Sequence, residues 1–153
     1  MLKTRFVAHR FFTFSVACFL LFTFASQLKE GLNEDVFKYT NQFRRSRGLP
    51  AVIMRDDLNA IARRHSEDMA RGRRSFGHSG FNQRESEIQK IIKPFYGMAE
   101  NVAFGARSGK DAVSQWKNSS VHRRNMLGNY KFIGIGTAQD RHGVIYYTQI
   151  FVR

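Results

Sequence analysis

The chain has 153 residues, a formal net charge of +13 and a single cysteine, Cys18. This length allows one domain of ordinary size with a sizeable hydrophobic core. A lone cysteine excludes an internal disulfide and a metal site built from cysteines, while the strong positive charge indicates attraction to polyanions.

Residues 1–26 have the pattern of a secretory signal. Three basic residues precede an apolar run of fourteen residues, 11–24, and Thr23 and Ala25 are small residues at the two positions that a signal peptidase reads. The run is shorter than the ~20 residues that a membrane-spanning helix needs, so cleavage is favoured over an uncleaved anchor. We therefore expect a mature protein that begins near Ser26 and is secreted or periplasmic.

Loss of the signal would leave one domain, residues 27–153, without any cysteine. It would remove three positive charges and no acidic ones, so the net charge of the remaining 127 residues would be +10. The basic residues are spread over Arg44-Arg45, Arg63-Arg64, Arg71 to Arg74, Lys90 to Lys93 and Arg123-Arg124. This spread favours polyanions in general over a specific nucleic acid, and for an exported protein it predicts anionic lipid or cell-wall polymer as the partner. A solvated basic surface without a specific partner is the alternative.

Helical periodicity predicts a first helix over residues 33–47, which Gly48-Leu49-Pro50 ends, and a second helix that begins at Asp56 or Asp57. The predicted inner face of the second helix consists of Leu58, Ile61, Ala62, His65 and Met69. Because the neighbours of His65 on this face are apolar, a packed histidine is favoured over a ligand.

The middle of the chain holds two polar residues in unusual settings. His78 lies in a glycine-rich loop, where it is either solvated or functional. A shorter helix is expected over residues 83–93, with Ile88, Ile91 and Ile92 as its apolar face. Glu100 then follows among small and apolar residues, and because burial of an unpaired carboxylate is costly, it must face water or have a partner.

Residues 110–119 continue as a helix, and a second short helix is expected to follow. Ser119 or Ser120 would cap its N-terminus and Gly128 would end it in the left-handed conformation. His122 then lies in the first turn, with Val121 and Met126 facing inward.

The C-terminal part is β-rich. Residues 132–138 and 144–152 are β-branched and aromatic, and Asp140 to Gly143 between them predict a hairpin. The last strand is apolar on both faces, so both faces must be covered. The sequence therefore predicts an α+β fold, a three-layer α-β-α sandwich around a small antiparallel sheet.

Seven short motifs, in order, resemble a bacterial CAP (SCP) domain of the cysteine-rich secretory protein, antigen 5 and pathogenesis-related superfamily. They are Asn41-x-x-Arg44…Gly48-Leu49-Pro50, His65-Ser66-x-Asp68-Met69-Ala70, Phe76-x-His78, Glu100-Asn101-Val102-Ala103-x-Gly105, Trp116-x-x-Ser119-x-x-His122-Arg123-x-Asn125-Met126-Leu127, Ile133-Gly-Ile-Gly136 and Tyr147-Thr-Gln-x-Phe151. The resemblance covers about residues 33–153 and implies the same sandwich and an exported location.

The resemblance also implies a cavity lined by His78, Glu100, Ser119 and His122. Ser119 stands where the family has a second glutamate, which leaves one carboxylate. His78, Glu100 and His122 are a sensible ligand set for a divalent metal such as zinc or calcium, since zinc hydrolases use two histidines and a glutamate with the fourth position left to water.

Two functions remain open from the sequence. The first is a non-catalytic binding module for lipid or cell-envelope ligands, which the basic charge and the signal favour. The second is a metal-dependent hydrolase that uses the cavity residues. Neither a His-Glu-x-x-His nor a Gly-x-Ser-x-Gly motif is present, so the sequence does not decide whether the protein is an enzyme.

Overall fold

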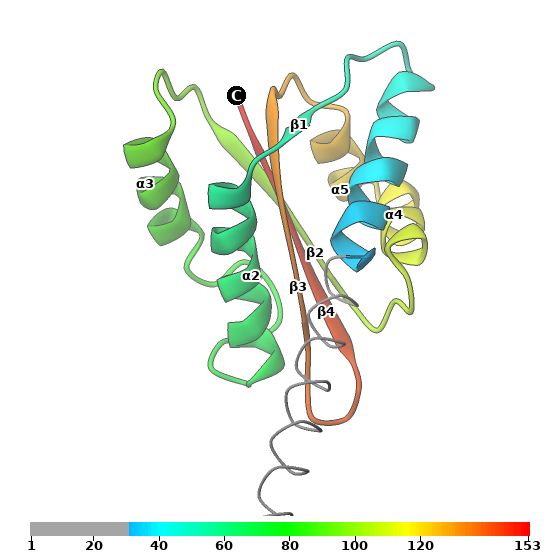
Figure 1. The fold of residues 1–153 in the computed structure, drawn as a ribbon, viewed down its shortest axis with the longest axis vertical. Coiled ribbons are helices and arrows are strands. Elements are labelled where there is room, and N and C mark those ends of the chain that lie inside the picture. Colours follow the sequence, from blue (N-terminus) through cyan, green and yellow to red (C-terminus); the bar gives the residue numbers. More distant parts are fainter. Residues whose placement is uncertain (1–30) are drawn as a thin grey trace, which may run out of the picture. The chain divides into compact units, whose positions relative to one another are not determined.

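The computed structural model describes residues 31–153, so the predicted signal sequence lies outside the described residues. The described chain begins in a helix that ends at residue 45. The elements that follow are β1 (Ile53–Met54), α2 (Asp56–Ala70), α3 (Phe81–Ile91), β2 (Met98–Phe104), α4 (Gly109–Asn118), α5 (Ser120–Met126), β3 (Phe132–Gln139) and β4 (Ile145–Val152) (Figure 1).

The four strands form one sheet in the order β1-β3-β4-β2. The hairpin of β3 and β4 is antiparallel, as predicted. β2, which the sequence does not indicate as a strand, pairs antiparallel with β4, whereas β1 pairs parallel with β3 through two residues. The sheet is therefore mixed rather than purely antiparallel. The sequence indicates β1 only as an extended piece, because two residues are too few for a recognisable strand pattern.

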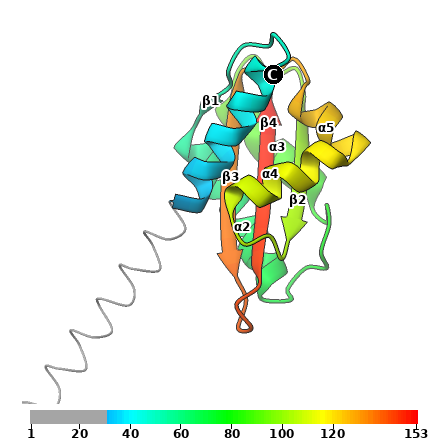
Figure 2. The ribbon, with the colours of Figure 1, turned by 90° about the vertical axis from the view of Figure 1, so that its right-hand side faces the viewer.

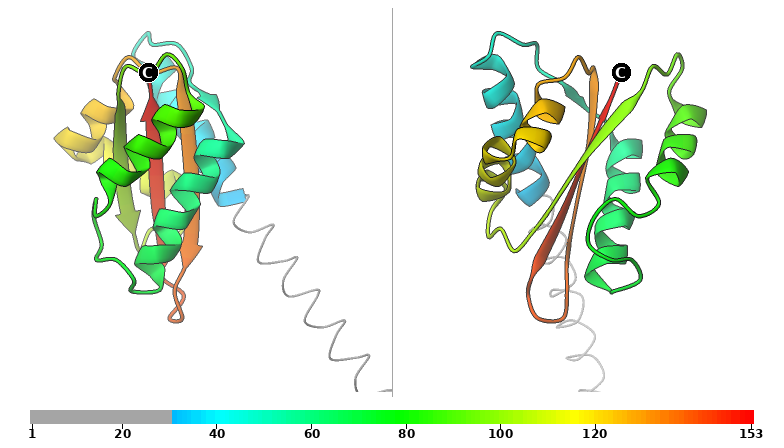
Figure 3. Two further views of the ribbon diagram at one scale, coloured as in Figure 1. Left: turned by 90° about the vertical axis from the view of Figure 1, so that its left-hand side faces the viewer. Right: turned by 180° about the vertical axis from the view of Figure 1, so that it is seen from behind.

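The helices cover both faces of the sheet, which confirms the three-layer α-β-α sandwich. Helices α2 and α3 lie on one face, and the helix that ends at residue 45, α4 and α5 lie on the other (Figures 1, 2 and 3). Residues of β4 enter both cores: Ile150 and Val152 pack with α2 and α3, while Tyr147 and Phe151 pack on the opposite side. The last strand is thus buried on both faces, as its sequence predicts.

Helix α2 lies directly on the backbone of β3. A Cβ atom at Gly136 would overlap the backbone nitrogen of Arg63, and one at Gly134 would come within 2.5 Å of the Leu58 Cβ. Only glycine allows this approach, so the Gly-x-Gly pair serves helix–sheet packing. All five residues of the predicted inner face of α2 are buried.

The segment from α4 to α5 is attached to β2 by side-chain hydrogen bonds. The Trp116 indole donates to the Val102 carbonyl at 3.0 Å, and the Asn125 amide donates to the Glu100 carbonyl at 3.2 Å. Met126 is fully buried, as predicted. The two helices therefore have a fixed place beside the edge of the sheet.

Several local predictions for this part of the fold are wrong. Val121 is 56% exposed, because in a helix this short Met126 supplies the buried side chain. Ile91 is also exposed, and Ile92 beyond the helix end is buried in its place. Gly128 is not left-handed; a Cβ there would overlap the Tyr130 ring, so close packing requires the glycine. Ser119 occupies the N-cap without a capping hydrogen bond from its side chain.

Arg44 has a structural role in this layer. Its guanidinium donates to the carbonyls of Pro50, Met126 and Gly128, and the residue is buried. Burial is the main reason that the pKa of Arg44 is lowered. Arg44 therefore ties the first described helix to the end of α5. It does not belong to the basic surface, which corrects the prediction from its charge alone.

Candidate functional site

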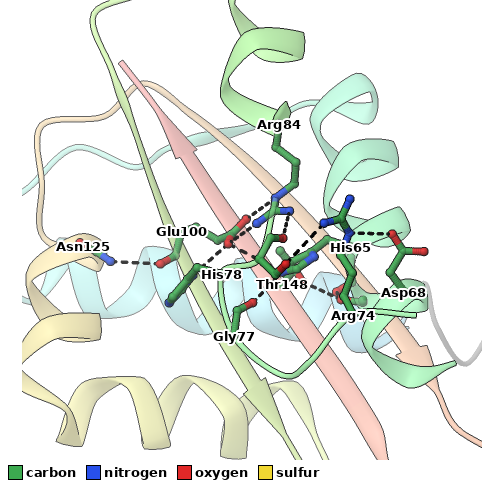
Figure 4. Close-up of polar contacts among 12 residues, drawn as sticks. His65, Asp68, Arg74, Gly77, His78, Arg84, Glu100, Asn125 and Thr148 are labelled. Atoms are coloured by element: carbon green, nitrogen blue, oxygen red, sulfur yellow. Dashed lines mark hydrogen bonds and ion pairs between the residues drawn. The ribbon is translucent and has the colours of Figure 1, made fainter. Parts of the chain in front are cut away.

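The predicted site is organised around a buried ion pair. Glu100 extends from β2 toward the layer of α2 and α3, and its side chain is fully buried. The Arg84 guanidinium donates from Nε to Oε2 at 2.7 Å and from Nη2 to Oε1 at 2.7 Å (Figure 4). Such a bidentate, charge-assisted pair is strong and specific in geometry. The partner that Glu100 requires is therefore an arginine.

His78 is the second partner of the carboxylate. Its Nδ1 lies 2.9 Å from Glu100 Oε1, and 49% of its side chain is exposed. An ionised carboxylate only accepts hydrogen bonds, so Nδ1 carries the proton in this pair, and in the neutral ring Nε2 keeps its lone pair. The structure thus brings together two of the predicted site residues, from the loop before α3 and from β2.

His65 belongs to the same cluster. Its Nε2 lies 2.8 Å from the Gly77 carbonyl and 3.8 Å from Glu100 Oε1, and the residue is 2% exposed. Burial lowers the pKa of His65 first, the positive charge of Arg84 lowers it further, and Glu100 opposes both effects. His65 is therefore a packed histidine, as its helical face predicts, that also fixes the loop carrying His78.

The other two predicted cavity residues lie on the α4–α5 side. His122 is partly buried in the first turn of α5, and burial, followed by the positive charge of His78, lowers its pKa. Its backbone carbonyl accepts a hydrogen bond from Asn101, but in the described residues its ring makes none with Glu100. Ser119 lies at the junction of the two helices. The pocket of about 130 Å³ that adjoins the cluster is lined by His65 and Arg84 rather than by His78 or His122.

Most of the lone pairs that Glu100 could offer to a divalent metal ion are already engaged. Arg84 donates one hydrogen bond to each carboxylate oxygen of Glu100, and His78 donates a second hydrogen bond to Oε1. A metal on this carboxylate would face a guanidinium held against the same oxygens. Among residues 31–153, no group of three or more histidine, cysteine, aspartate or glutamate side chains is arranged to hold a metal.

Arg84 is the residue that sequence reasoning missed. It lies four residues before Ile88, which is fully buried, so both share the inner face of α3. This spacing is visible in the sequence, but arginines are mostly exposed, so the pattern alone indicates surface charge. The sequence shows that Glu100 needs a partner, and its histidines are the more obvious candidates.

A groove on the opposite layer is a second candidate site. It lies between the first described helix and α4 and has a volume of about 310 Å³. Tyr39 and Phe43, four residues apart, form its aromatic side, and Lys110 and Lys117 line it from α4. None of the described lining residues is acidic.

Cations surround the two aromatic rings of this groove. The ammonium groups of Lys38 and Lys110 lie 5.5 and 6.0 Å from the Tyr39 ring centre, and that of Lys117 lies 5.1 Å from the Phe43 ring centre. Within residues 31–153 none of these lysines forms a salt bridge. The groove therefore presents positive charge that the described part of the chain does not neutralise.

An exposed aromatic cluster lies at the far end of β2 from Met98. Phe104 contacts Phe76 and Tyr146 with ring-centre distances of 4.7 and 5.9 Å, and Phe76 and Phe104 are about half exposed. Phe76 lies two residues before His78 on the same loop. The cluster is an exposed apolar feature close to the Glu100 site.

Comparison with known proteins identifies the family. Residues 37–151 match the model of the cysteine-rich secretory protein family, CAP, so the chain belongs to this family. It is 31% identical to the uncharacterized protein YkwD of Bacillus subtilis (strain 168) over 69% of this chain and 42% of that protein. None of the described helices is both long and apolar enough to cross a membrane.

Solved structures agree with this assignment. An extracellular protein with an SCP domain from Bacillus anthracis str. Ames matches with a TM-score of 0.72 and 27% identity, over 84% of this chain and 42% of that one. An outer surface protein of Borrelia burgdorferi matches with a TM-score of 0.67 and 20% identity, over 78% of this chain and 92% of that one, which shows a shared fold. The chain spans about two fifths of the two Bacillus proteins.

Proposed function

We propose that this chain is an exported CAP domain that serves as a non-catalytic binding module for an anionic polymer of the cell envelope. The observation that carries the proposal is the groove between the first described helix and α4, where lysines without a salt bridge in residues 31–153 surround two aromatic rings. The net charge of +10 on residues 27–153 adds a long-range attraction for the same class of ligand. The signal-like residues 1–26 and the extracellular or outer-surface relatives support export.

The shape of the groove favours a polymer with spaced negative charges. Lys110 and Lys117 are seven residues apart on α4, which is two helical turns or ~10 Å along the axis. Two cations at this separation can contact two phosphate or carboxylate groups of one chain. The proposed ligand is a linear polymer with repeated phosphate groups, for which inorganic polyphosphate is the probe.

The Glu100 cluster supports the non-catalytic part of the proposal. A carboxylate that serves as a general acid, a general base or a metal ligand needs a free oxygen and a tuned proton affinity. Glu100 is instead bound through both oxygens by Arg84. The alternative, a metal-dependent hydrolase with His78, Glu100 and His122, would require this pair to open.

The test is retention of the purified chain on immobilised polyphosphate at low salt. We expect Lys110→Gln/Lys117→Gln to weaken retention at least tenfold. The matched control is Lys90→Gln/Lys93→Gln, which removes the same charge on the side of α3, outside the groove. We expect this control to lose less than threefold. Equal losses in the two variants would show that bulk charge alone drives retention and would overturn the groove assignment.

A lipid surface is the competing partner, and a further variant separates it from a polymer. Vesicles containing anionic phospholipid are offered to the chain and to Phe76→Ser/Phe104→Ser, which removes the exposed aromatic side chains. Strong vesicle binding that this variant abolishes, together with no retention on polyphosphate, would assign the domain to membranes instead.

A further inference from the structure

We propose that Arg84 is the resident cation of the Glu100 cluster and that it keeps divalent metal ions out of the site. The proposal concerns the cluster on the α2–α3 side of the sheet and does not depend on the polymer groove. Arg84 takes the place that a metal ion would have between Glu100 and the histidines His78 and His122. It is also a positioning residue for His78, because it holds Glu100 in place.

The hydrogen bonds of Glu100 leave little room for a metal ion on its carboxylate. Oε1 has two lone pairs and accepts from Arg84 Nη2 at 2.7 Å and from His78 Nδ1 at 2.9 Å, while Oε2 accepts from Arg84 Nε at 2.7 Å. Only one lone pair of Oε2 remains, and it lies beside a full positive charge. A metal that bound there would gain one ligand bond and experience repulsion from the guanidinium in a buried, weakly screened site.

The position of Arg84 is fixed by its surroundings. Its side chain is only 8% exposed, and its Nη1 donates to the Ser79 carbonyl at 2.9 Å in addition to the two bonds with Glu100. Ile88, one turn further along α3, is fully buried and anchors that face of the helix. Displacement of the guanidinium would leave the Ser79 carbonyl and the carboxylate without this donor.

The fixed carboxylate also orients the His78 ring. Because Arg84 holds Glu100 in place, Glu100 fixes the His78 ring through Nδ1 and leaves Nε2 for contacts outside the cluster. The half-exposed imidazole is therefore oriented without a metal. Of the three predicted ligands, at most His78 and His122 remain, whereas zinc sites in proteins have three or four protein ligands.

Zinc titration of the full chain and of two variants tests the proposal. In the unmodified chain, we expect the NMR ring signals of His78 and His122 to stay unshifted at one equivalent of zinc, with exposed His142 as the internal reference for non-specific binding. Arg84→Met frees the carboxylate, so we expect calorimetry to show zinc affinity at least tenfold above that of the unmodified chain. Arg84→Met/Glu100→Gln should lose this gain.

Each outcome decides the proposal. Shifts of both histidine signals in the unmodified chain at one equivalent of zinc would overturn it, and so would a folded Arg84→Met variant with no gain in zinc affinity. If Arg84→Met does not fold, the histidine signals of the unmodified chain decide alone. Retention on polyphosphate is measured separately, so failure here leaves the proposed polymer binding intact.

Discussion

The roles of the buried polar residues in this domain follow from the partners that they need once they are removed from water. Glu100 and Arg84 come from β2 and α3, sixteen residues apart, and both side chains are almost fully buried. A buried pair of this kind contributes little net stability over an apolar replacement, but loss of one member leaves an uncompensated charge.

Arg84→Met is therefore expected to lower the free energy of unfolding by about 3–5 kcal/mol, the usual cost of breaking a buried ion pair. Arg84→Met/Glu100→Gln should recover part of this loss, because the unpaired charge is gone. Arg64→Met is the matched control: Arg64 pairs with Glu87 on the surface, where the expected loss is about 0–1 kcal/mol. Urea unfolding measures all three, and equal losses for Arg84→Met and Arg64→Met would refute the buried-pair assignment.

His65 predicts a pH dependence of stability. Its pKa in the folded state lies below the ordinary value of 6.5, mainly through burial, with Arg84 and Arg74 adding to the shift and Glu100 opposing it. Below pH 6.5 the His65 imidazole takes up a proton in the unfolded chain but stays neutral in the folded chain until the pH approaches its lower folded pKa. The contribution of His65 to the free energy of unfolding is therefore fully present above pH 6.5 and is lost as the pH falls toward the folded pKa of His65.

The measurement compares unfolding free energies between about pH 7.5 and pH 5 for the unmodified chain and His65→Gln. The glutamine amide can keep the hydrogen bond to the Gly77 carbonyl without titrating, so the stability of this variant should fall less steeply with acid. His65→Leu should show the same flatter profile but a lower stability at the higher pH, by about 1–3 kcal/mol, because the carbonyl loses its donor. Identical acid slopes in all three proteins would exclude His65 as a source of the pH dependence.

At the scale of helices and strands, the packing of α2 on β3 brings the Asn59 side-chain oxygen within 2.8 Å of the Ile135 amide, from which it accepts a hydrogen bond. Gly136→Ala would place a methyl group in steric overlap with the backbone of Ala62 and Arg63, which cannot move without lifting the helix. We expect a loss of at least about 1–3 kcal/mol, the typical cost of overpacking. Gly31→Ala, where no atom of residues 31–153 beyond the chain neighbours and the helix's own backbone lies within 4 Å of the added Cβ, is the control and should change stability by less than about 1 kcal/mol. Thermal unfolding distinguishes the two.

Sequence patterns predict these elements well where periodicity is strong. The sequence predicts both the inner face of α2 and the hairpin of β3 and β4, because alternation and helical spacing are local properties. The two-residue β1 and the exposure of Val121 depend on packing between distant segments. Contacts between distant segments are not visible in a local pattern. Family resemblance therefore predicts that Glu100 and His78 meet, whereas the sequence pattern indicates neither the role of Arg84 nor the lysine groove.

At the scale of the whole molecule, net charge and local geometry should affect different steps of polymer binding. Long-range charge steers association, whereas specific contacts slow dissociation. We expect Lys90→Gln/Lys93→Gln to lower the association rate on immobilised polyphosphate with an unchanged dissociation rate, and Lys110→Gln/Lys117→Gln to raise the dissociation rate. Biolayer interferometry at two salt concentrations separates the rates. Identical changes in the two variants would contradict a localised groove.

The attachment of α4 and α5 to β2 also determines how the domain meets other copies of itself. β2 is an edge strand, and a free strand edge offers carbonyl and amide groups to which a second chain can add. The carbonyls of Val102 and Glu100, two residues apart on β2, are already occupied by the Trp116 indole and the Asn125 amide. At the opposite edge, β1 is only two residues long. The tryptophan and the asparagine thus withdraw these two acceptors from pairing with a second chain. A chain in which both are replaced should self-associate as its concentration rises, which sedimentation analysis would detect.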